Sequence, residues 1–329
     1  MSLKYIEFLT PGTLYYKPIS QYNDESNKGT FIIQKLNVDL WNQNKDENWH
    51  YCINKKNELP KQGWKIHITA TLEEAQKTLD NVTPYLIEKN ISFKFVPAYQ
   101  ELLFKNSKNG DRSSSGKFIT IYPKDTREFL DLLTILENLI ISLHRGPYIL
   151  NDKQWNGSNV FFRYGGFVPM YTIYKGVSVP AIITPDGAKI PDLRNPYYEL
   201  PSFIEEPKVI KEMTKKMDKL FENEDTSKFD ELEVLSALHF SNGGGVYKVK
   251  KNNQTLVMKE GRPETGLDRL KLDGFKRIKI EKDTLKKLNS KPYVVDFYDY
   301  FEIWENNYLI EEYLEGINLQ EYIAQNLPF

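Results

Sequence analysis

A strand-like segment around residue 66 carries two side chains whose types and spacing suit work on an anion. Residues 64–68 (WKIHI) alternate apolar and polar side chains, which is the pattern of a half-buried strand. Lys65 and His67 would therefore share one face of that strand, about 7 Å apart, opposite the apolar residues. An ammonium beside an imidazole can hold a negatively charged group and transfer a proton near neutral pH.

Further cationic side chains follow along the chain. Lys94 stands alone in the apolar run SFKF, and Arg112 lies in the polar, basic loop of residues 105–117. The remaining candidates are Lys117, Tyr122, Lys124, Arg145 and Arg163. Lysines on exposed strand faces are common, and a lone histidine is more often structural than catalytic. These residues by themselves therefore leave both a phosphate site and an ordinary solvated surface open.

A glycine turn between two predicted strands is the second feature that could do chemistry. The turn and the residue after it are Gly243, Gly244, Gly245 and Val246. The next strand carries Lys259, and Glu281 on a helix predicted over residues 274–288 would pair with it. This order resembles the nucleotide clamp of protein kinases, where backbone amides approach the phosphates and the strand lysine grips them. The resemblance implies that the valine covers the adenine. The alternative is a plain hairpin turn.

The elements that must position these groups follow from periodicity and capping signals. Strands are predicted at 64–68, 91–96, 118–122 and 159–164, and helices at 71–89, 126–143 and 204–222. The first helix is expected to open with a capping box formed by Thr71 and Glu74. Residues 230–313 read as three strands, a helix and two strands, before a last helix at 319–325. We therefore expect an α+β domain over 1–203, a helical linker over 204–228 and a second domain over 229–329.

Composition excludes several classes of protein. The chain has 329 residues, and Lys+Arg 44 against Asp+Glu 45 leaves a net charge of -1. That balance argues against a general nucleic-acid or membrane-surface binder. Cys52 is the single cysteine, which excludes an internal disulfide framework and a cysteine zinc site, so no metal is expected. With no apolar run of about 20 residues and no signal-peptide pattern, we expect a cytoplasmic protein.

Five sequence runs together resemble a known family. They are GWKIHITA, SFKF, DRSSSGKFITIYP, GPYILND and RYGGF. They resemble the N-terminal lyase domain of class III lanthipeptide synthetases (the LanKC family), which join a lyase, a kinase and a cyclase. That domain is also similar to the phosphothreonine lyases that bacterial pathogens inject into host cells. The resemblance implies a phosphothreonine-lyase-like fold followed by the upper lobe (N-lobe) of a kinase, and β-elimination of phosphate from phosphoserine or phosphothreonine in a precursor peptide. The products would be dehydroalanine and dehydrobutyrine.

The resemblance also implies a role for each candidate. Lys94 would be the base and His67 the acid, with Lys65 on the peptide carbonyl or a phosphate oxygen. Tyr122 would lie near the leaving oxygen. Phosphate contacts would come from Arg112, Arg163 and Lys124, and less directly from Lys117 and Arg145. No cofactor is expected for the lyase reaction, whereas ATP or GTP with Mg²⁺ would serve only a full-length kinase domain.

The chain departs from the kinase pattern in two ways. His239 and Ser241 stand where kinases usually have the first two loop glycines, and no His-Arg-Asp or Asp-Phe-Gly motif follows Lys259. We therefore expect no phosphoryl transfer by this chain, and we expect the kinase lower lobe and the cyclase of a full-length enzyme to be missing from it.

The expected partner is a lanthipeptide precursor, with a leader segment and a phosphorylated core. The amphipathic stretches 204–222 and 268–289 could offer an apolar groove to a leader helix, or could simply pack inside the protein. Two alternatives to a lyase stay open. One is a module that binds a phosphopeptide or leader without reacting. The other is a truncated Ser/Thr kinase with a regulatory N-terminal domain.

Overall fold

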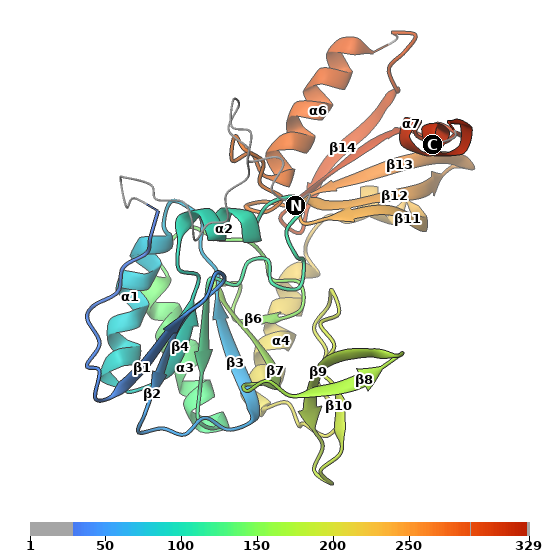
Figure 1. Ribbon diagram of the computed structural model, residues 1–329. Helices are drawn as coiled ribbons and strands as arrows, with labels where there is room; N and C mark the ends of the chain where they lie inside the picture. Colours follow the sequence, from blue (N-terminus) through green and yellow to red (C-terminus); the bar gives the residue numbers. More distant parts are fainter. Residues whose placement is uncertain (1–28, 290, 328–329) are drawn as a thin grey trace.

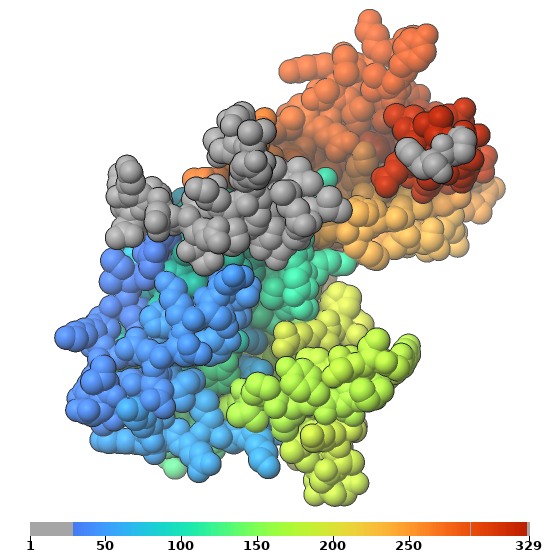
Figure 2. Space-filling model, viewed as in Figure 1, coloured from blue at the N-terminus to red at the C-terminus, as the bar shows by residue number. Residues whose placement is uncertain are grey.

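The computed structural model describes residues 29–289 and 291–327, and within them the strands form antiparallel sheets of seven, three and five strands. We call residues 29–221 the first unit and residues 227–327 the second unit. Figure 1 shows the seven-stranded sheet with its helices at one end of the molecule and the five-stranded sheet at the other. In the space-filling view, the three-stranded sheet projects from the surface of the first unit (Figure 2).

The elements of the first unit are β1 (Trp41–Lys45), β2 (His50–Asn54), β3 (Gln62–Ile68), α1 (Ala75–Glu88), β4 (Ser92–Phe95), α2 (Tyr99–Lys105), β5 (Ile119–Tyr122), α3 (Thr126–Ile140), β6 (Lys153–Gln154), β7 (Val160–Gly166), β8 (Tyr171–Tyr174), β9 (Val177–Ile183), β10 (Lys189–Pro191) and α4 (Lys208–Phe221). Those of the second unit are α5 (Ser227–Asp230), β11 (Glu233–Ser241), β12 (Gly244–Lys251), β13 (Gln254–Gly261), α6 (Gly274–Leu288), β14 (Phe297–Ile303), β15 (Asn306–Glu312) and α7 (Leu319–Asn326). The strand orders are β1-β2-β4-β5-β3-β7-β6, β10-β9-β8 and β11-β12-β13-β15-β14.

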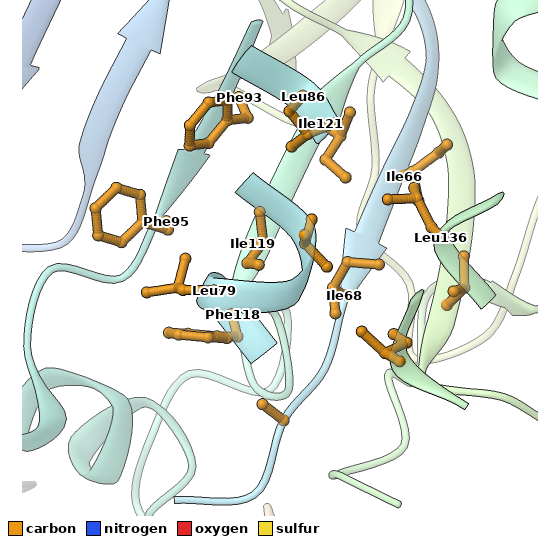
Figure 3. Close-up of a cluster of buried hydrophobic side chains, with 14 of the residues drawn as sticks. Ile66, Ile68, Leu79, Leu86, Phe93, Phe95, Phe118, Ile119, Ile121 and Leu136 are labelled. Carbon is orange, nitrogen blue, oxygen red and sulfur yellow. The ribbon is translucent and has the colours of Figure 1, made fainter. Parts of the chain in front are cut away.

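The apolar face of the seven-stranded sheet forms the core of the first unit with α1 and α3 (Figure 3). Trp64 on β3 stacks on Phe129 of α3 with ring centroids 4.9 Å apart. Phe93 and Phe95 on β4 are fully buried in the same cluster. The alternation predicted at residues 64–68 is therefore confirmed, and it leaves the opposite face of the sheet to the polar residues.

The two helices that cover this sheet begin with different caps. Asp125 caps α3 by accepting a hydrogen bond from the amide of Glu128 at 2.8 Å. At α1 the Thr71 hydroxyl accepts from the amide of Glu74 at 3.2 Å. The Glu74 carboxylate instead accepts from the backbone amide of His144 at 2.6 Å. The predicted capping box is therefore only half formed, because a distant loop takes the other half.

The segment predicted as a linker is largely integrated with the first unit. Ile210 and Met213 of α4 are buried in the same core cluster as β3 and α3. Lys153 of β6 reaches Glu206, just before α4, with an Nζ–Oε1 distance of 2.6 Å. Helix α6 likewise turns Ile278 onto the five-stranded sheet. The buried apolar residues of both helices thus pack inside their own units, and not in a groove open to a leader helix.

The second unit has the predicted order of strands and helix. The register of β12 against β13 places Val246 opposite Lys259, and β13 pairs with β15 on its other side. The predicted helix over 274–288 coincides with α6. Among the described residues, no helix is long and apolar enough to cross a membrane.

Candidate active site

Strand register brings the candidate base and acid onto one face of the seven-stranded sheet. Lys94 on β4 lies opposite Thr120 on β5, and Thr120 lies opposite His67 on β3. Residues directly opposite one another in antiparallel strands point to the same side of the sheet. Lys94 and His67 therefore flank Thr120 with their backbones about 10 Å apart, since neighbouring strands are about 4.8 Å apart. Lys65, two residues before His67, joins this face opposite Arg163 on β7.

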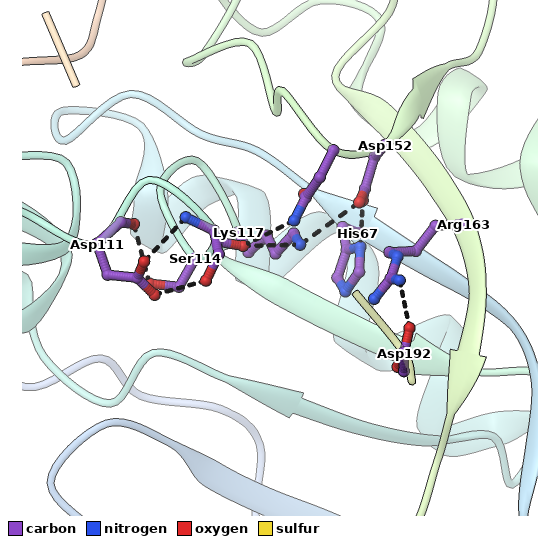
Figure 4. Close-up of polar contacts among 9 residues, drawn as sticks. His67, Asp111, Ser114, Lys117, Asp152, Arg163 and Asp192 are labelled. Carbon is purple, nitrogen blue, oxygen red and sulfur yellow. Dashed lines mark hydrogen bonds and ion pairs between the residues drawn. The ribbon is translucent and has the colours of Figure 1, made fainter. Parts of the chain in front are cut away.

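A buried carboxylate holds the histidine in place (Figure 4). Asp152, from the loop before β6, accepts a hydrogen bond from His67 Nδ1. The other carboxylate oxygen of Asp152 lies 3.4 Å from Lys117 Nζ, and that ammonium also donates to the carbonyl of Ser113 at 3.0 Å. With Nδ1 taken, the free nitrogen of His67 is Nε2, for which the described residues provide no hydrogen-bond partner.

Burial keeps His67 neutral in the absence of an anion. The side chain is 6% exposed, and its desolvation lowers the pKa to about 3 against the opposing effect of Asp152. The charge of Lys117 lowers the same pKa further. The hydrogen bond from His67 and the charges of Lys117 and Arg163 hold the pKa of Asp152 below its usual range despite its own burial, so this carboxyl is ionised. A phosphate dianion bound beside the ring would favour the imidazolium and raise the pKa of His67.

Lys94, unlike an exposed lysine, loses its proton easily near neutral pH because its pKa is lowered. Burial is the main cause that lowers its pKa from 10.5 to about 7, and the charges of Lys105 and Arg194 add to it. Its Nζ lies 4.1 Å from the ring centroid of Trp49 and 5.3 Å from that of Tyr51. About half of Lys94 is therefore an unprotonated amine at pH 7, which is the form a general base needs.

Two further cations lie beside this pair. Burial and the neighbouring Arg163 lower the pKa of Lys65 well below its usual value. Arg163 is itself held by Asp192, which follows β10, with Nη2 2.5 Å from Oδ1. This ion pair joins the small three-stranded sheet to the seven-stranded sheet.

Sequence reasoning missed two residues of this region. Asp152 lies inside the quoted run GPYILND, yet its role depends on His67, 85 positions away. Arg194 is exposed in the segment after β10, and its charge lowers the pKa of Lys65, Lys94 and Lys117. Neither belongs to a periodic pattern, so the only available signal was the charge itself.

We call Lys65, Lys94, Lys117, Arg163 and Arg194 the cation cluster. These five basic side chains face the two carboxylates of Asp152 and Asp192. The two guanidinium groups and the protonated lysines among them favour a bound anion. Tyr122 completes the face, since it lies two residues beyond Thr120 on β5 and packs edge-on against Phe167 at 5.2 Å. Burial raises the pKa of Tyr122, so its phenol stays protonated and can donate a hydrogen bond.

The structure does not bring three of the predicted phosphate ligands to this cluster. The guanidinium of Arg112 stacks on Phe240 of the second unit, 4.8 Å from the ring centroid. Lys124 is 60% exposed and lies 3.9 Å from Glu128 on α3, because β5 ends at Tyr122 and the alternation stops there. Arg145 pairs with Glu305 of the second unit at 2.8 Å.

A cavity of about 350 Å³ lies in the second unit at the predicted glycine turn. Its lining includes Gly243, Gly244, Gly245, Val246, Lys259 and Glu281. Lys259 Nζ lies 2.7 Å from Glu281 and 2.6 Å from Glu311. Although burial lowers the pKa of Lys259, its two carboxylate partners raise it above the usual value. Gly244 has φ +138°, and a Cβ there would lie 1.9 Å from the carbonyl oxygen of Glu260, so the turn requires glycine.

The side chains around these two sites do not form a metal-binding group of their own among the described residues. Within the described ranges 29–289 and 291–327, no group of three or more His, Cys, Asp or Glu side chains could hold a metal ion. The donor atoms around the cation cluster are mostly ammonium and guanidinium nitrogens, which repel a cation and attract an anion.

Comparison with known proteins shows the family of this chain. The family described as "RamC, N-terminal domain" matches residues 30–220. The chain is 34% identical over 292 residues to the "Probable SapB synthase" of Streptomyces coelicolor, which covers 88% of this chain and 31% of that protein. A shorter match, 43% identical over 94 residues, covers 28% of this chain and 13% of the MAP kinase kinase PBS2 of Saccharomyces cerevisiae.

The chain therefore spans less than a third of the length of either relative. The family match covers more than half of the chain, and the similarity to the synthase covers most of it. Together they confirm the resemblance to class III lanthipeptide synthetases, and the chain belongs to the RamC N-terminal domain family.

Proposed function

We propose that the first unit is a lyase that eliminates phosphate from phosphoserine or phosphothreonine in a lanthipeptide precursor peptide. The observation that carries this proposal is the pairing of Lys94, whose pKa is lowered to about 7, with His67 across Thr120 inside a cluster of cations. The relative named as a probable SapB synthase supports a role in the biosynthesis of such a peptide.

Lys94 is the general base in this proposal. The Cα proton of a peptide is a weak acid, so its removal needs an unprotonated amine that water does not surround. Lys94 meets both needs through its burial beside Trp49 and through the charge of Lys105. An exposed lysine with a pKa near 10.4 would be unprotonated in only about one molecule in 2500 at pH 7.

His67 is the general acid. Asp152 fixes the ring through Nδ1 and leaves Nε2 to face the leaving group. Because the bound phosphate dianion favours the imidazolium, substrate binding itself supplies the protonated form. Lys94 takes the Cα proton, the Cβ–O bond breaks with both electrons going to the phosphate oxygen, and His67 protonates that oxygen. A Cα=Cβ double bond remains in the peptide, and inorganic phosphate leaves.

The remaining cations stabilise charge in this step. Arg163 and Arg194 are suited to paired hydrogen bonds with the phosphate oxygens. Lys65 lies beside both and can stabilise the negative charge that builds on the peptide carbonyl when the Cα proton leaves. Lys117 keeps Asp152 ionised, which in turn keeps His67 oriented.

Three variants and a control test these roles. Lys94→Ala and His67→Ala should each leave a phosphorylated precursor peptide intact in mass spectrometry, whereas the unsubstituted chain converts it to the dehydrated peptide. Lys94→Arg should also be inactive, since it keeps the positive charge but cannot act as a base near neutral pH. Lys56→Ala is the matched control, because Lys56 is exposed and outside the cation cluster. Full activity of Lys94→Arg would rule out the proposed base.

A binding module without catalysis is the competing function. The same cluster would then hold a phosphopeptide and release it unchanged. Measured release of inorganic phosphate separates the two, because binding alone frees none.

For the second unit we propose the nucleotide-binding upper lobe of a kinase domain in a longer synthetase. The glycine turn, the Lys259–Glu281 ion pair and the cavity between them support it, as does the local match to a MAP kinase kinase. Val246 would cover the base, and the glycines and Lys259 would hold the phosphates. The bound Mg²⁺–nucleotide would supply the phosphoryl group for making the phosphopeptide. In this longer protein the precursor peptide is the substrate of both units.

A further inference from the structure

A loop of the first unit is inserted against the glycine turn of the second unit. The backbone amide of Asn242, at the tip of that turn, donates to the carbonyl of Lys108 at 3.2 Å. On the other side of the loop, the amide of Lys108 donates to the carbonyl of Leu267 at 3.1 Å. The Asn242 side chain is fully buried and donates to the carbonyl of Ser107 at 2.8 Å. The tip of the turn is therefore held by backbone contacts with the other unit.

The close fit of this loop leaves little room for it to move. A Cβ added at Gly110 would lie 2.6 Å from the carbonyl oxygen of Lys105 and 2.8 Å from Asn242 Nδ2. The amide of Leu267 also donates to the carbonyl of Asn106 at 3.0 Å. The backbone of Lys108 thus has a fixed position next to the glycine turn.

The side chain of Lys108 lines the cavity that contains the glycine turn and Lys259. Within the described part of the chain it has no ion-pair partner, and it is exposed. The other cations of this cavity are already engaged. Lys259 is paired with Glu281 and Glu311, and Arg277 donates to the carbonyl of Leu272 at 2.8 Å.

A further cation in this cavity would help to hold a polyphosphate. A nucleoside triphosphate stays anionic even with one Mg²⁺ bound, while the charge of Lys259 is balanced by two carboxylates. On the β11–β12 hairpin, Val246 pairs with His239, Gly244 pairs with Ser241, and the turn tip at Asn242 lies beyond both pairs. If Val246 covers the base as proposed above, the turn tip lies on the phosphate side. Lys108 is next to that tip, so its ammonium is suited to the terminal phosphate of a nucleoside triphosphate and not to the phosphate attached to the nucleoside.

We propose that Lys108 of the first unit binds the terminal phosphate of a nucleoside triphosphate held in the cavity of the second unit. The nucleotide site is then shared by both units, and a nucleotide bound there contacts the first unit only when its terminal phosphate is present. This inference rests on the proposed nucleotide site of the second unit and is independent of the lyase proposal for the first.

Isothermal titration calorimetry tests the inference by measuring the affinity of the whole chain for ATP and for ADP, each with Mg²⁺. Lys108→Ala should weaken ATP binding about fivefold, as expected for the loss of one exposed charge-assisted hydrogen bond, and should change ADP binding less than about twofold. Lys108→Arg should keep most of the ATP affinity. Lys56→Ala is the matched control for loss of one exposed lysine, and thermal unfolding without nucleotide checks that each variant is folded.

Three outcomes would overturn the inference. They are an equal loss for ATP and ADP, no loss for either, and no binding of either nucleotide to the unsubstituted chain. Lys259→Ala distinguishes the first two from failure of the nucleotide site itself, since it should weaken both nucleotides. Phosphate release from a phosphopeptide without nucleotide tests the lyase proposal separately.

Discussion

The lowered pKa of Lys94 makes the stability of the protein depend on pH in a way that a single substitution can reveal. Burial lowers this pKa from 10.5 to about 7 in the folded chain, so the unfolded chain binds the proton more tightly. The destabilising effect of Lys94 is therefore full below about pH 7, falls as the pH rises, and disappears above the unfolded pKa. Lys94→Met removes this effect, because an apolar side chain of similar size has no charge to bury.

The size of the effect follows from the two pKa values. At pH 6 nearly all of the 3.5-unit difference acts, which is an upper limit of about 4.7 kcal/mol in favour of the unfolded chain. At pH 9 the same relation leaves about 2 kcal/mol. The stability gained by Lys94→Met over the unsubstituted chain should therefore shrink by about 2.7 kcal/mol between pH 6 and pH 9.

Urea unfolding of both chains at the two pH values measures this difference. Lys56→Met provides the matched control and should show no such change, since Lys56 is exposed. Lys94→Arg should stay destabilised at both pH values because a guanidinium keeps its charge. If the advantage of Lys94→Met is the same at pH 6 and pH 9, the pKa of Lys94 is not lowered and its role as a base loses its physical support.

Three other substitutions give separate checks. Asp152→Asn removes the charge that orients His67 and should lower kcat for phosphate release by about 10²- to 10⁴-fold, by analogy with other buried carboxylate–histidine pairs; an unchanged kcat would contradict the assignment. Arg194→Gln should raise KM for the phosphopeptide but leave Tm nearly unchanged, because Arg194 is exposed; steady-state kinetics measure the first and thermal unfolding the second. Gly110→Ala should lower Tm and speed hydrogen exchange at Asn242, since the new Cβ has no room; exchange as slow as in the unsubstituted chain would show that the junction adapts.

The parts of the fold that could be predicted are those with local signals. Alternation at residues 64–68 gave β3 and the shared face of Lys65 and His67. Lys94 alternates with its apolar neighbours in SFKF, and the register places it opposite Thr120, on the face away from Phe93 and Phe95. In the second unit, the order of strands and the Lys259–Glu281 pair were predicted from the turn and helix signals.

The features that could not be predicted depend on contacts between distant segments. Arg112 lies in a polar, basic loop and was predicted to contact phosphate, but its guanidinium stacks on Phe240 of the second unit. Lys124 follows β5 by two residues, and only the position of α3 shows that it pairs with Glu128. Asp152 joins the cluster through tertiary packing, which leaves no periodic trace in the sequence.

The central claim is that the first unit breaks a carbon–oxygen bond by elimination, and the mass of a phosphoserine-containing precursor peptide tests it most directly. After incubation with this chain in the absence of nucleotide, the account predicts a peptide lighter by one phosphoric acid, together with an equal amount of free phosphate. A peptide that keeps its full mass would show binding alone. A peptide that returns to the mass of the unmodified serine form would show hydrolysis, and either result would contradict the proposed lyase.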